Sequence, residues 1–365
     1  MKRSRPYNFG AGPAMLPESL LKEAQEELLD WRGQGASILE IGHRSDEFKQ
    51  LMREAETDLR ILLNIPENYH VLFLGGAART QFAMIPMNLL ANDKKAGYII
   101  SGVWSSLAYE EAQKCSGQAY CVASSSPQNF FTLPSPADWI IQDDTAYLYY
   151  TPNETINGVQ FHEKPDAGGI PLVADMTSCL LSEPINVSDY GLIFAGAQKN
   201  IAIAGLTIVI IDSALLEKKT SHPIPTMLDY RVHAQNHSLY ATPPVFNCYL
   251  AAKMFQWVKT QGGIRELYRK NRLKADKLYQ FIDTSTFYEC KVQKNARSIM
   301  NVCFSLVRKD LEDLFLQQAR KNGLIALKGH RITGGLRASI YNAMPMDGVD
   351  SLIEFMQCFA EEHHS

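Results

Sequence analysis

Six short apolar runs, each bounded by glycine, proline or a small polar residue, are the feature of this chain that most constrains its fold. They cover residues 70–74, 98–101, 146–150, 170–174, 192–195 and 206–211. Each run is apolar throughout rather than alternating, which is typical of strands that a mostly parallel sheet buries on both faces. Helical segments, such as 104–114, separate several of the runs. The chain up to about residue 255 is therefore predicted to form an α/β sheet covered by helices.

Helical periodicity dominates on either side of these runs. One helix is predicted from Pro17 to Trp31, a second after Ser45 and a third over 81–90. After Pro243 the pattern becomes α+β, with helices over 246–258, 263–282, 311–322 and 349–362 and strands at 299–306 and 336–340. Because 365 residues exceed one compact core, we predict an N-terminal segment (1–16), a large domain (17–255) and a smaller α+β C-terminal domain (256–365).

The overall charge and the cysteines argue against several classes of protein. A net charge of -3 supplies no field that would hold nucleic acid or an anionic membrane. The seven cysteines are odd in number and form no C-x-x-C pair, so neither a disulfide framework nor a metal site is expected. The longest aliphatic run, 206–211, is too short to span a bilayer. We expect a cytoplasmic protein that acts on small molecules.

Asp175 and Lys199 stand at or just past the ends of two predicted strands, about 24 residues apart. Ligands bind at the carboxyl ends of the strands in such sheets. A lysine there can form a Schiff base with the aldehyde of pyridoxal phosphate, and an aspartate can keep the pyridine nitrogen of that cofactor protonated. Each residue alone is explained more simply as a surface lysine or a helix-capping aspartate. Together with the features below, they favour a pyridoxal-phosphate site.

Two further features suit the same cofactor. The glycine-rich turn at 75–81 joins a predicted strand to a predicted helix, and the amides at the start of a helix bind phosphate. The turn matches neither a Walker loop nor a G-x-G-x-x-G fingerprint, so it does not indicate a nucleotide, and many such turns only reverse the chain. Trp104 could stack on the cofactor ring, although a core tryptophan would explain it equally well.

Three basic clusters stand out in a chain without excess positive charge. They are His43-Arg44, His330-Arg331 and Arg337. The planar guanidinium of arginine matches phosphate and carboxylate groups bidentately, so the clusters would suit a substrate with a phosphate at one end and a carboxylate at the other. For any one of these arginines taken alone, a surface charge in an ordinary ion pair is the better explanation.

Taken together, these motifs resemble those of one family, the phosphoserine aminotransferases, which are fold-type I pyridoxal-phosphate enzymes of aminotransferase class V. The matching segments run in order along nearly the whole chain: 8–13, 40–45, 81–82, 86–89, 153–158, 196–200, 240–244, 328–331 and 334–345. The last of them is long and highly specific. The resemblance implies a mostly parallel seven-stranded sheet in the large domain and a homodimer with active sites at the subunit interface.

The resemblance also implies a role for each candidate residue. Lys199 would be the Schiff-base lysine and Asp175 the partner of the pyridine nitrogen. Trp104 would stack on the ring, and Thr155 would bond the phenolic oxygen. The cofactor phosphate would be held by Ala78, Arg79, Gln198 and, from the other subunit, Thr242. The substrate phosphate would be bound by His43, Arg44, His330 and Arg331, and the α-carboxylate by Arg337.

The implied reaction converts 3-phosphohydroxypyruvate and glutamate into O-phosphoserine and 2-oxoglutarate, a step of serine biosynthesis. Bacterial members also act on the 4-phosphohydroxythreonine pair, which feeds pyridoxine biosynthesis. The chain departs from the family pattern at Ala77 and Ala78, at Ala202-Ile203 and at Ala241. Alanine at 241 would delete one contact to the cofactor phosphate, worth roughly 0.5–1.5 kcal/mol, so weaker retention of the cofactor is expected.

Other functions are distinguishable from this one. Aminotransferases of serine, alanine or glyoxylate act on small uncharged side chains and would not need the paired His-Arg clusters. A cysteine desulfurase would need a nucleophilic cysteine on a mobile loop, and no cysteine here stands in a convincing one. A catalytically silent sensor of pyridoxal phosphate would have reason to lose Lys199 or Asp175, and both are present.

Overall fold

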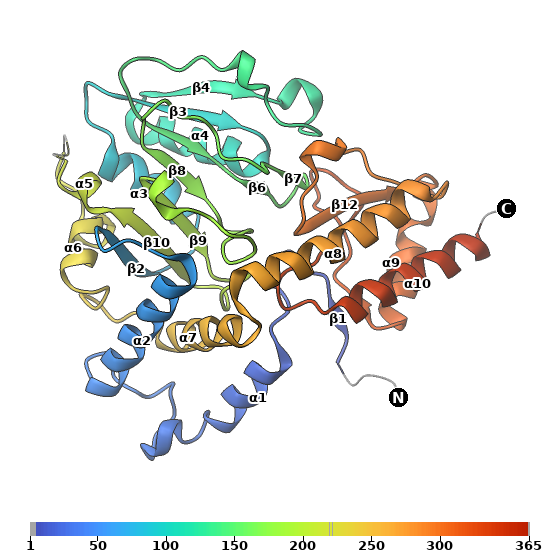
Figure 1. Ribbon diagram of the computed structural model, residues 1–365, viewed down its shortest axis with the longest axis horizontal. Coiled ribbons are helices and arrows are strands. Elements are labelled where there is room, and N and C mark those ends of the chain that lie inside the picture. Colours follow the sequence, from blue (N-terminus) through green and yellow to red (C-terminus); the bar gives the residue numbers. More distant parts are fainter. Residues whose placement is uncertain (1–4, 219, 221, 364–365) are drawn as a thin grey trace.

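The computed structural model describes residues 5–218, 220 and 222–363, and a seven-stranded sheet lies at its centre (Figure 1). The sheet has the order β2-β10-β9-β8-β5-β3-β4, with β10 antiparallel to both neighbours and every other pair parallel. The predicted mostly parallel sheet is therefore confirmed. The strands are β2 (Tyr69–Gly75), β3 (Lys95–Ile100), β4 (Ala119–Ser124), β5 (Thr145–Tyr150), β8 (Leu172–Asp175), β9 (Leu192–Gly196) and β10 (Leu206–Asp212).

Both faces of this sheet are buried, as its uninterrupted apolar runs predicted. Along β2, Val71 and Phe73 belong to one hydrophobic core, whereas Leu72 and Leu74 belong to another. Successive residues of a strand point to opposite faces, so the two cores lie on the two sides of the sheet. The first core is completed by α2 (Asp46–Leu63) and α7 (Val245–Thr260), and the second by α3 (Thr80–Leu89) and α4 (Val103–Ser116).

The C-terminal part of the chain forms a third core beside the sheet, orange and red in Figure 1. Phe9 and Met15 of the N-terminal segment are buried in it, and β1 (Tyr7–Asn8) pairs with β13 (Leu324–Ile325). The start of the chain is thus held by its last third. The other elements here are the antiparallel strands β11 (Tyr288–Glu289), β12 (Asn301–Leu306) and β14 (Leu336–Ser339) and the helices α8 (Gly263–Thr284), α9 (Glu312–Lys321) and α10 (Met346–Glu362).

One helix, α8, connects the first and third cores. Near its start Ile264 and Leu267 are buried with α2 and α7, and further along Leu278 and Ile282 are buried with β12 and α10. Its fully buried Asn271 lies between the two sets and donates a hydrogen bond to the carbonyl of Ser182 at 3.0 Å. The division of the chain into 1–16, 17–255 and 256–365 stays a prediction.

The first helix is shorter than its periodicity predicted. Helix α1 spans Glu18–Glu26, and Leu28 and Leu29 beyond it are 37% and 85% exposed. Trp31 is fully buried, but a turn closed by its own N–H to the carbonyl of Ala36 positions it, at 2.9 Å. The helical spacing of Trp31 was therefore coincidental, because tertiary packing and not a helix face buries it.

Strand β4 was not predicted, and its place in the sheet explains why. It lies at the sheet edge and pairs with β3 alone. Tyr120 is half-buried and Cys121 exposed, so the strand lacks the uninterrupted apolar run of the central ones. The antiparallel direction of β10 was equally invisible, since its residues are as apolar as those of its parallel neighbours.

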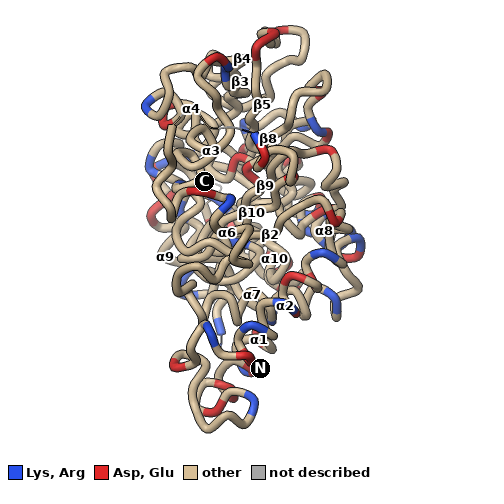
Figure 2. The backbone as a smooth tube through the Cα atoms, turned by 90° about the vertical axis from the view of Figure 1, so that its left-hand side faces the viewer, with Lys and Arg blue, Asp and Glu red and all other residues tan. Residues whose placement is uncertain are grey.

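The surface carries charges of both signs. Basic and acidic residues are interspersed along the backbone traced in Figure 2. In the described part of the chain no helix has the length and apolar character needed to cross a membrane. Among the same residues, no group of three or more histidine, cysteine or acidic side chains is arranged to hold a metal ion.

The topology brings six strand ends to one edge of the sheet. Strands β2, β3, β4, β5, β8 and β9 run in the same direction, because only β10, which lies between β2 and β9, is antiparallel to its neighbours. Their carboxyl ends therefore meet at a single edge. Gly76 follows β2, Gly102 follows β3, Thr151 follows β5, Asp175 ends β8 and Lys199 stands three residues beyond β9.

Candidate active site

Lys199 lies at this edge, in the wall of a cavity of about 240 Å³ that we call the Lys199 cavity. The side chain is only 8% exposed, and its Nζ donates a hydrogen bond to Oγ1 of Thr155. The segment after β9 approaches α3 closely, since a Cβ added at Gly196 would lie 3.0 Å from Cβ of Ala78. The cavity is lined by Ala77, Ala78, Arg79, Phe82, Trp104, Thr151, Asn153, Thr155, Asp175, Thr177, Ser178, Gln198 and Lys199.

Burial makes the amine of Lys199 easier to deprotonate. Desolvation lowers the pKa of Lys199 to about 8, the nearby carboxylate of Asp175 raises it in part, and the positive charge of Arg337 lowers it again. A larger share of this amine than of an ordinary lysine is therefore neutral near pH 7, and only the neutral form is a nucleophile or a proton acceptor.

Burial shifts the pKa of Asp175 in the opposite direction from that of Lys199. It is 5% exposed, and desolvation raises its pKa, while hydrogen bonds from Thr177, including one from the backbone N–H at 2.9 Å, and the charge of Lys199 lower it. A buried carboxyl of this kind is stabilised in its ionised form by a positive charge placed beside it. A protonated ring nitrogen would supply that charge.

Trp104 and Arg79 form another wall of the cavity. The guanidinium carbon of Arg79 lies 5.0 Å from the centroid of the Trp104 ring, and Nζ of Lys199 lies 6.0 Å from it. The indole Nε1 is buried without a hydrogen-bond partner among the described residues, as are Thr151 Oγ1 and Asn153 Oδ1. Polar atoms left in this way indicate a place for a polar ligand.

The shape and chemistry of the Lys199 cavity fit pyridoxal phosphate. Its wall holds a neutralisable amine, a buried carboxyl and an indole ring that offers a flat apolar surface and lies close to both Lys199 and Arg79. The wall also includes Ala77, Ala78 and the charged Arg79, which directly precede α3. Backbone amides and a positive charge at a helix start suit a phosphate. Gly76 makes this sharp turn possible with φ of +124°, which side chains rarely allow.

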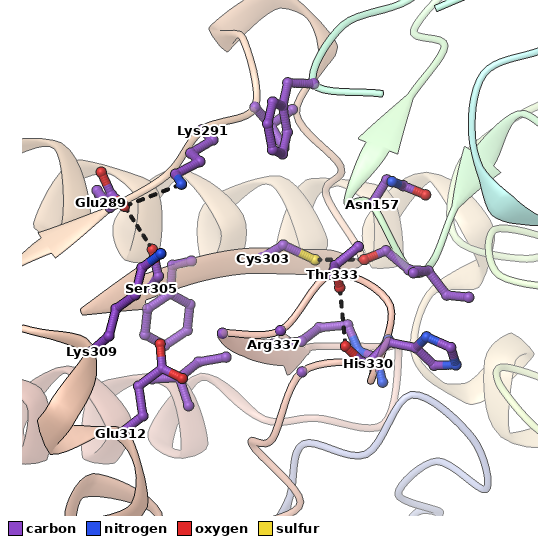
Figure 3. A pocket seen from close by; sticks show the side chains of 18 residues that line it. Asn157, Glu289, Lys291, Cys303, Ser305, Lys309, Glu312, His330, Thr333 and Arg337 are labelled. Atoms are coloured by element: carbon purple, nitrogen blue, oxygen red, sulfur yellow. Dashed lines mark hydrogen bonds and ion pairs between the residues drawn. The ribbon is translucent and has the colours of Figure 1, made fainter. Parts of the chain in front are cut away.

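A second cavity of about 270 Å³, the Arg337 cavity, is shown in Figure 3. Arg337 and His330 lie together at one end of it, and Glu289, Lys309 and Glu312 lie at the other.

The segment 153–157 links the two cavities. Arg337 donates from Nη1 to the carbonyl of Thr155 at 3.5 Å, and the Thr155 side chain lines the Lys199 cavity. Its neighbours Ile156 and Asn157 line the Arg337 cavity. A ligand bound by Arg337 would therefore lie beside Lys199.

Positive charges surround His330. Desolvation lowers the pKa of His330, and the charges of Arg337, Arg331 and Arg79 lower it further. Arg331 itself is exposed, and Nε of Arg337 is buried without a partner in the described chain. This end of the cavity offers several positive charges to an anion.

The structure brings most of the predicted site residues together, but not all. Seven of the eight predicted cofactor residues line the Lys199 cavity: Ala78, Arg79, Trp104, Thr155, Asp175, Gln198 and Lys199. The eighth, Thr242, is exposed and lines a separate cavity with Ala241 and Thr80. His330 and Arg337 line the Arg337 cavity, whereas His43, Arg44 and the exposed Arg331 line neither cavity. His43 and Arg44 lie between α1 and α2, and Arg331 lies between β13 and β14.

Five residues of the Lys199 cavity were not predicted: Phe82, Thr151, Asn153, Thr177 and Ser178. Their positions were nevertheless detectable. Thr177 and Ser178 follow Asp175 directly, and Thr151 and Asn153 follow a predicted strand in the same way as Asp175 ends one. The rule that strand ends carry the site would have included these four.

Comparisons with known proteins agree over the whole chain. The sequence matches the family Aminotransferase class-V over residues 6–352. It is 64% identical over 360 residues to the phosphoserine aminotransferase of Legionella pneumophila (strain Lens), covering 99% of both chains. The phosphoserine aminotransferase from Bacillus circulans subsp. alkalophilus superposes with a TM-score of 0.96 at 43% identity, covering 99% of both chains. A pyridoxal-phosphate-bound phosphoserine aminotransferase from Trichomonas vaginalis has a TM-score of 0.94 at 37% identity, covering 97% of this chain and 100% of that one.

The lowered pKa of Lys199 predicts unusual reactivity. We expect acylation of the cofactor-free protein by a small reagent such as acetic anhydride to rise with pH and reach half its maximal rate at Lys199 near pH 8. An ordinary lysine would need about pH 10.4. In Asp175→Asn the midpoint should move to lower pH, because the carboxylate favours the charged amine. Peptide mass spectrometry measures the labelling, with the exposed Lys294 as internal standard. A Lys199 midpoint near pH 10 would contradict the assignment.

Proposed function

Because this chain belongs to the class-V aminotransferases, and among them to the phosphoserine aminotransferases, we propose that it binds pyridoxal phosphate in the Lys199 cavity and transfers the amino group of glutamate to 3-phosphohydroxypyruvate. The products are O-phosphoserine and 2-oxoglutarate, the reaction of serine biosynthesis. The 4-phosphohydroxythreonine pair of pyridoxine biosynthesis carries the same phosphate and the same α-carboxylate and is a second substrate. The link between Arg337 and Thr155 carries this proposal, since it places a carboxylate-binding arginine next to a neutralisable lysine.

The residues of the Lys199 cavity have separate tasks. When bound, pyridoxal phosphate supplies an aldehyde that condenses with an amine and a protonated pyridine ring that accepts electrons from the substrate's α-carbon. Asp175 holds the positive charge of that ring nitrogen. Lys199 would anchor the cofactor and, as a free amine, would take the proton from the substrate's α-carbon and deliver it to the carbon that carried the cofactor's aldehyde, the transfer that transamination requires. Trp104 covers one side of the cavity and excludes water, and Thr155 donates to the phenolic oxygen.

Phosphate binding divides between the cofactor and the substrate. The cofactor phosphate binds at the start of α3, near Ala78 and Arg79, with Gln198 beside them. The substrate binds in the Arg337 cavity, where Arg337 binds its α-carboxylate and His330 its phosphate, and the exposed Arg331 next to His330 adds a second positive charge for the phosphate. Arginine is suited to both anions because its guanidinium donates two parallel hydrogen bonds.

A homodimer completes the site. His43, Arg44 and Thr242 line neither cavity of their own chain, although the first two have the chemistry of a phosphate site and the third of a cofactor contact. In a twofold dimer each chain can present these residues to the cavity of the other. The partner's Thr242 then reaches the cofactor phosphate, and the partner's His43 and Arg44 reach the substrate phosphate.

The two substrate arginines should differ in kinetics. We expect Arg331→Ala to lower kcat/KM for phosphohydroxypyruvate by about 3–5 kcal/mol, because in the proposed dimer the second subunit covers the exposed Arg331 and its desolvated pair with the substrate phosphate loses one member. The glutamate half-reaction should suffer less, since its side-chain carboxylate carries one charge. Arg337→Ala should damage both half-reactions alike, because both substrates have an α-carboxylate. Single-turnover titrations of each half-reaction measure this. Equal losses for both substrates in Arg331→Ala would contradict the assignment of a phosphate site and would favour a generic aminotransferase.

The shared site can be tested by mixing two inactive variants. Lys199→Ala lacks its own amine, and Arg44→Ala lacks a residue that acts in the partner's site. After the two proteins are unfolded and refolded together, half of the dimers are mixed, and each mixed dimer contains one intact site. About a quarter of the wild-type activity per dimer should return, counting half of the sites in half of the dimers. If Arg44 acts within its own chain, no intact site forms and the mixture stays as inactive as its components.

A further inference from the structure

Glu154 is a fully buried carboxyl that lines neither the Lys199 cavity nor the Arg337 cavity. It lies on β6 (Asn153–Glu154), one strand of a hairpin whose other strand is β7 (Val159–Gln160). Its two oxygens accept hydrogen bonds from the backbone N–H of Trp104 at 3.0 Å and of Ser105 at 2.8 Å. The Ser105 hydroxyl donates a third bond at 2.6 Å. These donors belong to the first turn of α4, so the carboxyl caps a helix from a distant segment.

The first turn of α4 depends on this hairpin. The residue before the helix, Gly102, has no side chain to cap it, and Asn157 of the hairpin accepts from the N–H of Val103 at 3.2 Å. All three N–H groups of residues 103–105 thus bond to one hairpin. A Cβ added at Gly102 would collide with the carboxyl group of Glu154, and Gly102 has extended backbone with φ of -179°, so space alone excludes a larger residue.

The same hairpin carries the groups that face the two cavities. Thr155 follows Glu154 directly, and its hydroxyl receives the hydrogen bond of Lys199 while its carbonyl receives that of Arg337. Trp104, whose N–H bonds to Glu154, presents its ring to the Lys199 cavity. One carboxyl therefore joins the helix that holds the aromatic wall to the strand that holds Thr155.

Burial makes the ionised form of the Glu154 carboxyl unfavourable. Desolvation raises the pKa of Glu154 to about 7, against the opposing effect of the bonds from Ser105 and Trp104, and the charge of Asp175 raises it further. Lys199 and Tyr149 also lie within electrostatic reach of it. The positive end of the α4 dipole offsets part of this cost. Buried ionisable groups gather at functional sites, where position matters more than stability.

We infer that Glu154 is a positioning residue, which sets the spacing between the Trp104 ring and Thr155 and so shapes the Lys199 cavity for the ring of its cofactor. It touches neither cofactor nor substrate. This role rests on the proposed function, because it assumes that pyridoxal phosphate occupies the cavity.

Two variants disturb the contact between Glu154 and the start of α4, one by changing the carboxyl and the other by changing the residue before the helix. Glu154→Gln replaces an acceptor by an amide NH₂ that faces a backbone N–H, so one of the two backbone bonds is lost. Gly102→Ala leaves the charge intact and pushes the carboxyl away from α4. Each should raise the dissociation constant of the cofactor-free protein for pyridoxal phosphate about tenfold or more, as expected for loss of a charged hydrogen bond. Each should also speed hydrogen exchange at the amides of Trp104 and Ser105 before cofactor is added.

The circular dichroism of the bound cofactor gives an independent signature. At saturating pyridoxal phosphate its visible band should be weaker in Glu154→Gln, because the ring lies less firmly against Trp104. Asp212→Asn removes the carboxylate that caps the remote helix α5 (Ser213–Leu216) and serves as control; its dissociation constant should equal that of the wild type. A wild type that fails to bind pyridoxal phosphate would refute the proposed function instead. Normal dissociation constants in both Glu154→Gln and Gly102→Ala would overturn the positioning role.

A double variant separates positioning from simple capping. In Glu154→Ala/Gly102→Ser the truncated alanine leaves room for the serine, which caps α4 locally. Slow exchange at Trp104 and Ser105 should return relative to Glu154→Ala, yet the dissociation constant should stay raised because the helix is no longer joined to Thr155. Recovery of cofactor affinity would show that Glu154 only caps the helix. If hydrogen exchange at Trp104 and Ser105 stays fast in the double variant, the serine has not capped α4. The dissociation constants of Glu154→Gln and Gly102→Ala then decide whether Glu154 has the positioning role.

Discussion

The removal of one amine from water is the constraint on which the rest of the structure depends. Lys199 is placed where burial lowers the pKa of its side chain, and Asp175 is close enough to limit that shift. Neither residue could be buried without the apolar strands on each side, since a lysine or aspartate on a solvated loop keeps its ordinary pKa. The seven-stranded sheet, closed on both faces by helices, supplies that dry edge.

A short segment of the chain, 153–158, joins the parts of this edge. It gives a hydroxyl to Lys199, a carbonyl to Arg337, a carboxyl to the start of α4 and, through Asn153, hydrogen bonds to Ser178 and Asn301. Each of these partners comes from a different element. The segment is therefore the place where the large sheet and the C-terminal core are set relative to the Lys199 cavity, and small displacements in it would alter several contacts together.

Much of this could be predicted from the sequence, for a physical reason. Strands buried on both faces leave uninterrupted apolar runs, and polar residues at their ends mark a candidate site, so the sequence could predict that Asp175 and Lys199 lie at one edge of the sheet, where the structure brings them into one cavity. Where burial comes from tertiary packing, the pattern failed: Trp31 has helical spacing but lies in a turn, and β4 is an edge strand without an apolar run. Glu154 was named only as part of a motif, because the neighbouring sequence does not indicate that it caps a helix 50 residues away in sequence.

The sequence and the single chain meet the same limit at the substrate site. His43 and Arg44 have suitable chemistry, yet the cavities of their own chain do not include them, so a second subunit must complete the phosphate site in this account. Selectivity for a phosphorylated substrate is therefore the central claim to test.

The most direct test mixes the protein loaded with pyridoxal phosphate rapidly with O-phosphoserine, glutamate or serine and follows the visible absorbance of the cofactor. Phosphoserine and glutamate should convert it with a second-order rate constant at least about 100 times that for serine, since serine has no second anionic group to pair with His330 and Arg331. Serine reacting as efficiently as phosphoserine would contradict the account.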